Sequence, residues 1–235
     1  MSLTCGIIGL PNVGKSTIFN ALTSSSIPAE NYPFCTIEPH MGIVPLPDPR
    51  LKVLEKIYEP EKVTPANVEF TDIAGLVKGA SKGEGLGNQF LGQIRQVDSI
   101  IHVVRCFEDE NISHVEESID PIRDIELIET ELLLADLVTI EKSISRLDKL
   151  SRSDKKIASN LELVKKLKIF CDEGNPARNF SCNSSELGFI KSMFLLTSKP
   201  IMYIANINED ELVSDSLGKF SSLLFTKFEG EETEV

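Results

Sequence analysis

The sequence is poor in several residue types, and each shortage narrows what the chain can be. Its 235 residues include no tryptophan, three tyrosines and three histidines. No apolar run approaches the ~18 residues that a membrane-spanning helix needs, and the first residues lack the pattern of a secretory signal peptide. We therefore expect no membrane partner and a cytoplasmic location.

Cysteine and positive charge are also in short supply. The five cysteines are scattered and form no C-x-x-C pair, which argues against a disulfide framework or a zinc site and is typical of a reducing compartment. Lysine and arginine number 24 against 36 acidic residues, giving a net charge of -12. That balance opposes non-specific binding of nucleic acid over the whole surface, although it is compatible with a local basic patch. We expect no direct binding to DNA.

One stretch carries a complete nucleotide-binding pattern. Residues 9–16, GLPNVGKS, match G-x-x-x-x-G-K-[ST] at every fixed position. Residues 4–8 before it have the pattern of a buried strand, and residues 17–22 after it begin a helix. Glycines let the backbone N–H groups of such a loop approach a polyphosphate closely. The predicted nucleotide-binding residues of the loop are Asn12, Val13, Gly14, Lys15, Ser16 and Thr17.

Four further features predict how phosphate and metal are handled. Lys15 can neutralise the β- and γ-phosphates and is a catalytic candidate, while Ser16 can offer its hydroxyl to Mg²⁺. Thr36 stands ahead of a predicted strand at residues 41–44, where a switch NTPase places its second Mg²⁺ ligand. Asp72 ends a predicted strand at residues 67–71 and can hold a Mg²⁺-bound water, whereas the Gly75 N–H can contact the γ-phosphate.

The residue after Gly75 is Leu76, where signalling GTPases of this architecture have a glutamine that orients the attacking water. Leucine cannot do this, so we expect slow intrinsic hydrolysis or a water positioned by another group. Residues 77–87 carry four glycines and two lysines. They fit either a surface loop or a switch that orders over the nucleotide, and their place directly after Gly75 favours the switch.

A predicted strand at residues 199–205 leads into Asn206-Ile207-Asn208-Glu209. A GTPase has Asn-Lys-x-Asp here, and its aspartate accepts two hydrogen bonds from guanine. The longer Glu209 side chain would misplace that carboxylate, and adenine lacks the 2-amino donor. We therefore predict that Asn206, Ile207 and Glu209 bind the base and favour adenine over guanine, or discriminate weakly. A plain strand-to-helix cap is the alternative.

Alternating strand and helix patterns predict an α/β fold: a P-loop NTPase with a mostly parallel sheet flanked by helices. Residues 121–150 and 157–167 instead carry apolar stripes on either side of a polar turn, which indicates an inserted antiparallel coiled-coil arm. Two ordinary helices packed on the sheet are the alternative. We predict a nucleotide-binding domain of residues 1–118 and 197–235, with an inserted helical domain at 119–196. The end of the nucleotide-binding domain is expected to hold a final strand at residues 222–226 and no helix that closes the sheet.

Together these motifs resemble the YchF subfamily of Obg-like ATPases, in the translation-factor class of P-loop GTPases. The matching pieces are GLPNVGKS at 9–16, NYPFCTIEP at 31–39, DIAGLVKGASKGEGLG at 72–87, NINE at 206–209 and the region 124–136. The resemblance covers residues 2–210 and implies ATP binding, slow hydrolysis and association with the ribosome, with a part in translation or stress regulation. It also implies a role in hydrolysis for His114, and a K⁺ site at Asn12 in addition to Mg²⁺.

Members of that subfamily continue past the last strand, close the sheet with a helix and add a C-terminal TGS domain. This sequence ends at Val235, so we expect a shortened member. Three functions stay open from the sequence: an ATPase switch, a conventional GTP-binding switch, and an interaction module that holds nucleotide without significant hydrolysis. Lys15 and Ser16 oppose the last of these, whereas Leu76 favours it.

Overall fold

A single sheet organises the chain. The computed structural model describes residues 2–24, 41–73, 86–109, 118–150, 155–214 and 217–229. Within these residues the sheet has five strands in the spatial order β2-β3-β1-β4-β5. All neighbouring pairs are parallel except β2 with β3, which is antiparallel. The predicted mostly parallel sheet is confirmed, and its strands are β1 (Leu3–Ile8), β2 (Met41–Pro45), β3 (Asn67–Asp72), β4 (Ser99–Arg105) and β5 (Ile201–Asn206).

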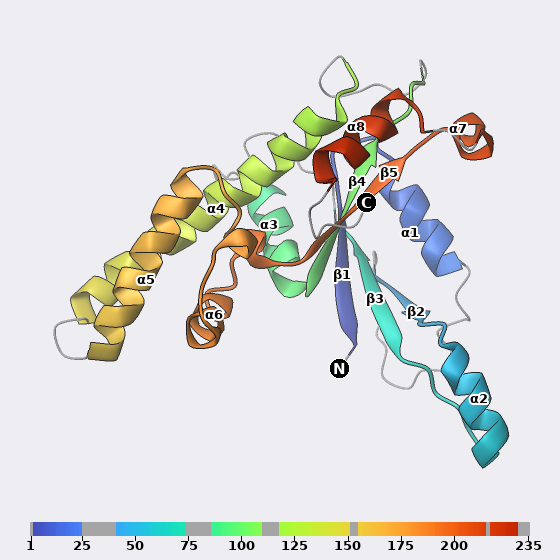
Figure 1. The fold of residues 1–235 in the computed structure, drawn as a ribbon, viewed down its shortest axis with the longest axis horizontal. Coiled ribbons are helices and arrows are strands. Elements are labelled where there is room, and N and C mark those ends of the chain that lie inside the picture. Colours follow the sequence, from blue (N-terminus) through green and yellow to red (C-terminus); the bar gives the residue numbers. More distant parts are fainter. Residues whose placement is uncertain are drawn as a thin grey trace.

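Helices flank the sheet on both faces (Figure 1). On one face lies α1 (Lys15–Ser24), and on the other lie α3 (Leu86–Gln96) and the first half of α4 (Pro121–Leu150). The remaining helical elements are α2 (Pro49–Tyr58), α5 (Lys155–Asp172), η3 (Ala177–Asn179), α6 (Ser184–Lys191), η4 (Leu196–Ser198), α7 (Glu209–Val213) and α8 (Lys219–Phe228). None of the described helices has the length and apolarity to cross a membrane.

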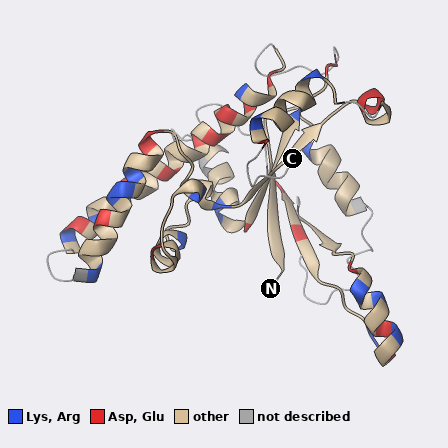
Figure 2. Ribbon diagram, in the orientation of Figure 1, with Lys and Arg blue, Asp and Glu red and all other residues tan. Residues whose placement is uncertain are grey.

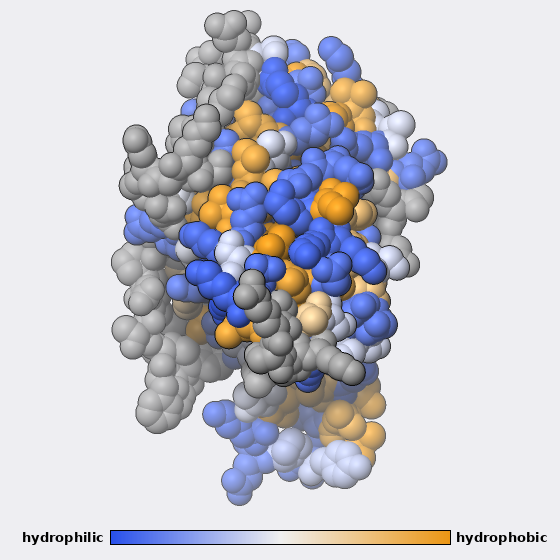
Figure 3. Space-filling view, turned by 90° about the vertical axis from the view of Figure 1, so that its left-hand side faces the viewer, coloured by the Kyte–Doolittle hydropathy of each residue, from blue (hydrophilic) through white to orange (hydrophobic). Residues whose placement is uncertain are grey.

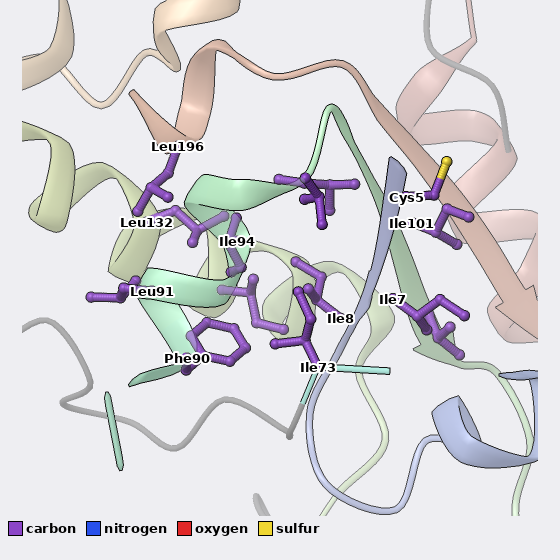
Figure 4. Close-up of a cluster of buried hydrophobic side chains, with 14 of the residues drawn as sticks. Cys5, Ile7, Ile8, Ile73, Phe90, Leu91, Ile94, Ile101, Leu132 and Leu196 are labelled. Atoms are coloured by element: carbon purple, nitrogen blue, oxygen red, sulfur yellow. The ribbon is translucent and has the colours of Figure 1, made fainter. Parts of the chain in front are cut away.

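The main core lies between the sheet and the helices of the α3 side. Alternate residues of a strand point to opposite faces, and Figure 4 shows Ile8 directed toward α3 while Ile7 points away from it. Leu132 of α4 and Leu196 of η4 meet Ile94 of α3 in the same cluster (Figure 4). Burial of this set removes a large apolar area from water, which is the main stabilising contribution to the fold.

Helix α4 serves two cores. It begins as predicted at Asp120-Pro121, because the Asp120 carboxylate accepts hydrogen bonds from the N–H groups of Ile122 and Arg123 at 3.2 and 3.1 Å. Its first half, including Ile128 and Leu132, packs in the core of the sheet. Its second half packs on α5, where Ile140 and Leu147 of α4 share a cluster with Val164 and Leu167 of α5. The first half of α4 therefore packs on the sheet, although the sequence predicts that all of α4 belongs to the inserted helical domain at residues 119–196.

Two local predictions were wrong. Residues 222–226 lie in α8 rather than in a strand, because Leu224 and Phe228 recur at helical spacing and pack on Tyr203 and Ile125. Because α8 is a helix that follows β5, the expectation that no helix closes the sheet was also wrong. Helix α6 ends at Lys191, and Phe194, which has a positive φ of 52°, precedes the turn into η4.

A buried carboxylate joins α4 to the chain that returns to the sheet. Asp136 is fully buried and accepts hydrogen bonds from the Leu196 N–H at 2.7 Å, the Thr197 N–H at 2.8 Å and the Thr197 hydroxyl at 2.7 Å. Burial raises the pKa of the Asp136 carboxyl, although these donors oppose the shift. This bonding fixes η4, and through it the start of β5.

We predict that Asp136→Ala destabilises the fold by about 3–5 kcal/mol, because it leaves three donors buried without an acceptor. Urea unfolding measures the change. Glu141→Ala, on the exposed side of the same helix, is the control, and its loss should stay below about 1 kcal/mol. Equal losses in the two variants would contradict the role given to Asp136.

Candidate nucleotide-binding site

The loop at residues 9–16 connects β1 to α1 and depends on two glycines. Gly9 has a φ of 154°, and a Cβ there would lie 2.5 Å from the Val103 carbonyl oxygen. Gly14 has a φ of 97°, and a Cβ there would lie 2.3 Å from Nδ2 of Asn206. A side chain at Gly9 would collide with the Val103 backbone, and one at Gly14 would have to displace the Asn206 amide and adopt a strained positive φ. The loop therefore has the close backbone packing that a phosphate-binding turn requires.

Lys15, the first residue of α1, folds back over the loop. Its ammonium group donates a hydrogen bond of 2.7 Å to the Leu10 carbonyl, and the residue is only 8% exposed. Burial lowers the pKa of Lys15, while the nearby charge of Asp72 acts in the opposite direction. A partly desolvated cation interacts strongly with an anion placed beside it, as the predicted phosphate contact requires.

Ser16 and Asp72 come from distant parts of the sequence and meet at the same edge of the sheet. The Ser16 hydroxyl donates to Oδ2 of Asp72 at 2.7 Å. The contact arises because Asp72 ends β3, and β3 pairs in parallel with β1, which leads into the loop. In the part of the chain that the structure describes, no group of three His, Cys, Asp or Glu residues could hold a metal. The Ser16–Asp72 pair matches the donors that a phosphate-bound Mg²⁺ uses in P-loop proteins.

Asn206 has a contact that the sequence did not reveal. Its side-chain Nδ2 donates to the Val13 carbonyl at 2.9 Å, and its own carbonyl accepts from the Cys106 N–H at 2.8 Å. The end of β5 is thus bonded directly to the phosphate loop. The two other predicted base-binding residues follow at once: Ile207 is half-buried, and Glu209 is exposed at the first position of α7.

The rest of the predicted site divides into placed and unplaced residues. Asn12 is exposed in the loop with a φ of 62°, Val13 is buried, and Thr17 is exposed in the first turn of α1. Three predicted residues, Thr36, Gly75 and His114, lie outside the described residues, as does Leu76. The structure therefore brings together the Lys15, Ser16, Asp72 and Asn206 part of the predicted site.

Two buried basic residues of β4 support this edge of the sheet. The guanidinium of Arg105 lies 4.6 Å from the ring centre of Phe107 and donates to the carbonyl oxygens of Phe107 and Asp109, at 3.1 and 3.3 Å. His102 is 1% exposed, and burial, together with the charges of Lys15 and Arg178, lowers its pKa to about 3. His102 is thus a neutral core residue. Arg105 carried no sequence signal apart from its position at a strand end.

Comparison with known proteins identifies the family to which this geometry belongs. Residues 4–135 match the family model described as 50S ribosome-binding GTPase. The chain belongs to this family. The match begins with β1 and ends within α4, so it includes the phosphate loop, Asp72 and the sheet as far as β4.

The curated relatives narrow the family further and confirm the resemblance to YchF. The chain is 51% identical over 236 residues to the ribosome-binding ATPase YchF of Bacillus subtilis, covering all of this chain and 64% of the relative. It is 55% identical over 211 residues to the protein of the same name from Haemophilus influenzae, covering 89% of this chain and 58% of the relative. The solved YchF GTPase of Schizosaccharomyces pombe has a TM-score of 0.83 at 36% identity, covering all of this chain and 65% of that one. The chain thus spans less than two thirds of these relatives.

We predict that Gly14→Ala lowers nucleotide affinity by about a hundredfold, because the added carbon would displace the Asn206 amide and strain the loop. Titration with a fluorescent ATP analogue measures the loss. Gly92→Ala is the matched control: its added carbon meets no atom within 4 Å, and alanine is the better helix former by about 1 kcal/mol. Nucleotide binding by Gly14→Ala at the level of the control would show that the loop tolerates a side chain.

Proposed function

We propose that this YchF-family chain is a Mg²⁺-dependent ATP-binding switch that hydrolyses ATP slowly and associates with the ribosome. The observation that carries the proposal is the meeting of Ser16 with Asp72 beside the buried Lys15 ammonium, at the edge of the sheet where the loop glycines also lie. Oriented N–H groups, one lysine and a hydroxyl–carboxylate pair together form a polyphosphate site.

Each group has a separate task in the proposed site. The loop N–H groups and Lys15 hold the phosphates and balance their charge, and Lys15 stabilises the charge that develops as the γ-phosphate leaves. Ser16 and Asp72, with Thr36 as the predicted third contributor, would hold Mg²⁺, which supplies electrostatic stabilisation of the phosphate oxygens. Gly75 is proposed to contact the γ-phosphate through its N–H, and His114 to assist hydrolysis. Asn12 is proposed to contribute to a K⁺ site.

Slow turnover follows from Leu76, which has no group that could orient water. ATP is proposed over GTP because Glu209 and Ile207 replace the residues that recognise guanine. The exposed position of Glu209 at the start of α7 leaves its carboxylate accessible to a base held above the loop. The names of the bacterial relatives support both ATP and the ribosome, while the name of the Schizosaccharomyces pombe protein keeps GTP as the second candidate.

The enzymatic part of the proposal is tested by single-turnover hydrolysis of ATP and GTP with Mg²⁺. We expect ATP hydrolysis on the order of 10⁻⁴ to 10⁻² s⁻¹, the range of switch NTPases without a partner. Lys15→Ala should reduce it about tenfold or more. ATP binding with no hydrolysis above that of Lys15→Ala would favour the interaction module instead.

Base preference has its own test. The double change of Ile207→Lys with Glu209→Asp restores the guanine-recognition pattern and should raise the affinity for GTP relative to ATP by about tenfold or more, because a shorter carboxylate can accept both guanine donors. Competition between the two nucleotides measures the ratio. A preference for GTP in the wild-type protein would contradict the proposal that ATP is the substrate.

A further inference from the structure

Helix α7 carries the predicted base-binding residue Glu209, yet it buries none of its own residues. It is five residues long, Glu209–Val213. Its two apolar side chains, Leu212 and Val213, are 73% and 84% exposed. Because an isolated helix of this length is not stable in water, contacts with neighbouring elements have to hold α7 in place, and with it the carboxylate of Glu209.

The exposed Leu212 and Val213 do not by themselves mark α7 as a docking surface. Other large apolar side chains of the described chain are also exposed, among them Ile169 and Phe194, and the face that includes the far ends of α4 and α5 shows small hydrophobic patches among hydrophilic residues (Figure 3). Single apolar side chains scattered over a surface are normal in globular proteins. The distinctive feature of α7 is its charge.

All three acidic residues of α7 lie in its first turn. They are Glu209, Asp210 and Glu211, and Figure 2 shows α7 as a compact acidic segment beyond the end of β5. Glu209 and Asp210 are exposed, whereas Glu211 is half-buried. Glu211 is therefore the acidic residue of this turn that lies against the rest of the protein.

The Glu211 carboxylate bonds to the beginning of α8. Its Oε1 accepts hydrogen bonds from the Gly218 N–H at 2.5 Å and from the Ser221 hydroxyl. Gly218 is the N-cap residue of α8 and has no side chain with which to cap the helix itself. Carboxylates are stabilised at a helix N-terminus, where N–H groups lack partners within the helix. Glu211 thus gives α8, from another helix, an acceptor that its own N-cap residue lacks.

The residues on the α8 side suit this contact. A Cβ at Gly218 would lie 2.4 Å from Oε2 of Glu211, so an alanine there would have to push the carboxylate away. Ser221 is 1% exposed, and its hydroxyl donates to Glu211 in this buried position. Hydrogen bonds shielded from water are stronger than exposed ones. The contact between Glu211 and α8 therefore restrains the first turn of α7.

Glu211 also lies near the nucleotide edge of the sheet. Burial, together with the charges of Glu211 and Asp124, raises the pKa of the Cys106 thiol to about 12. The N–H of Cys106 donates to the Asn206 carbonyl at 2.8 Å, and the Asn206 side chain bonds to the phosphate loop. The link between α7 and α8 is thus close to the end of β5, where the base is proposed to bind.

We propose that Glu211 is a positioning residue for base recognition: by bonding α7 to the N-terminus of α8, it fixes the first turn of α7 and so the place of Glu209 beside the base. This role rests on the proposed function, in which Glu209 recognises the base. Two hydrogen bonds to one carboxylate limit where the turn can lie, and a recognition group that is already in place loses less freedom when the ligand binds.

Glu211→Ala tests this role in calorimetric titrations with Mg²⁺ and ATP, GTP or inorganic tripolyphosphate. We expect ATP binding about fivefold to tenfold weaker and a ratio of ATP to GTP affinity closer to one. Tripolyphosphate affinity should not change, because this ligand has no base. Asp210→Ala removes the same charge from an exposed position of the same turn and should leave all three affinities within about twofold of wild type.

Two further variants separate positioning from charge and from stability. Glu211→Gln keeps an acceptor oxygen without the charge and should retain most of the ATP affinity. Gly218→Ala displaces the carboxylate and should reproduce the loss seen in Glu211→Ala. The double variant should lose no more than Glu211→Ala alone, since both changes break one contact. Additive losses, or a loss in Glu211→Gln as large as in Glu211→Ala, would contradict the positioning role.

The three ligands also distinguish failure of this role from failure of the proposed function. Equal loss of ATP and tripolyphosphate binding in Glu211→Ala, or a lower melting temperature with an unchanged ratio of ATP to GTP affinity, would show that Glu211 only stabilises the fold. A wild-type preference for GTP that Glu211→Ala weakens, with tripolyphosphate binding intact, would reject adenine and keep the positioning role. Wild-type protein that binds both nucleotides no more tightly than tripolyphosphate would reject base recognition by Glu209 and the role of Glu211 together.

Discussion

The hydrogen bond from the Asn206 amide to the Val13 carbonyl is the interaction on which the site depends. It joins the end of β5 to the phosphate loop across 193 residues of sequence, at a distance of 2.9 Å. The absence of a side chain at Gly14 is what lets the amide reach the loop. Together with the Ser16–Asp72 bond from β3, it holds the loop between two strands, so the loop is fixed before a ligand arrives and less ordering remains to oppose binding.

Much of the fold and part of the site could be predicted because their signals are local. The phosphate loop follows from eight consecutive residues, and the strands follow from short apolar runs between turn residues. The contact of Ser16 with Asp72 could be expected from parallel topology alone. The bonding of Asn206 to Val13 could not, because it requires knowing that a strand end and a glycine lie within contact distance.

The helical region shows the same limit. The apolar periodicity predicted its two long helices. It left open whether they form an arm or pack on the sheet, and α4 does both: its first half packs on the sheet and its second half packs on α5. Ile128 and Ile140 belong to different cores although both continue the same apolar stripe. Helix α8 was missed because a short run of apolar residues also fits a strand. Only the structure shows that these residues cover Tyr203 and Ile125. Asp136, which anchors η4 to α4, carried no sequence signal apart from its charge.

The most direct measurement of the central claim is calorimetric titration with Mg²⁺ and inorganic tripolyphosphate, comparing wild-type protein with Asn206→Ala. Tripolyphosphate has no base, so it reports only on the loop. If Asn206 acts by fixing the loop, the variant should bind tripolyphosphate about tenfold more weakly, the effect of losing one buried hydrogen bond and the order that it imposes. Unchanged tripolyphosphate binding, with loss confined to ATP, would show that Asn206 serves the base alone.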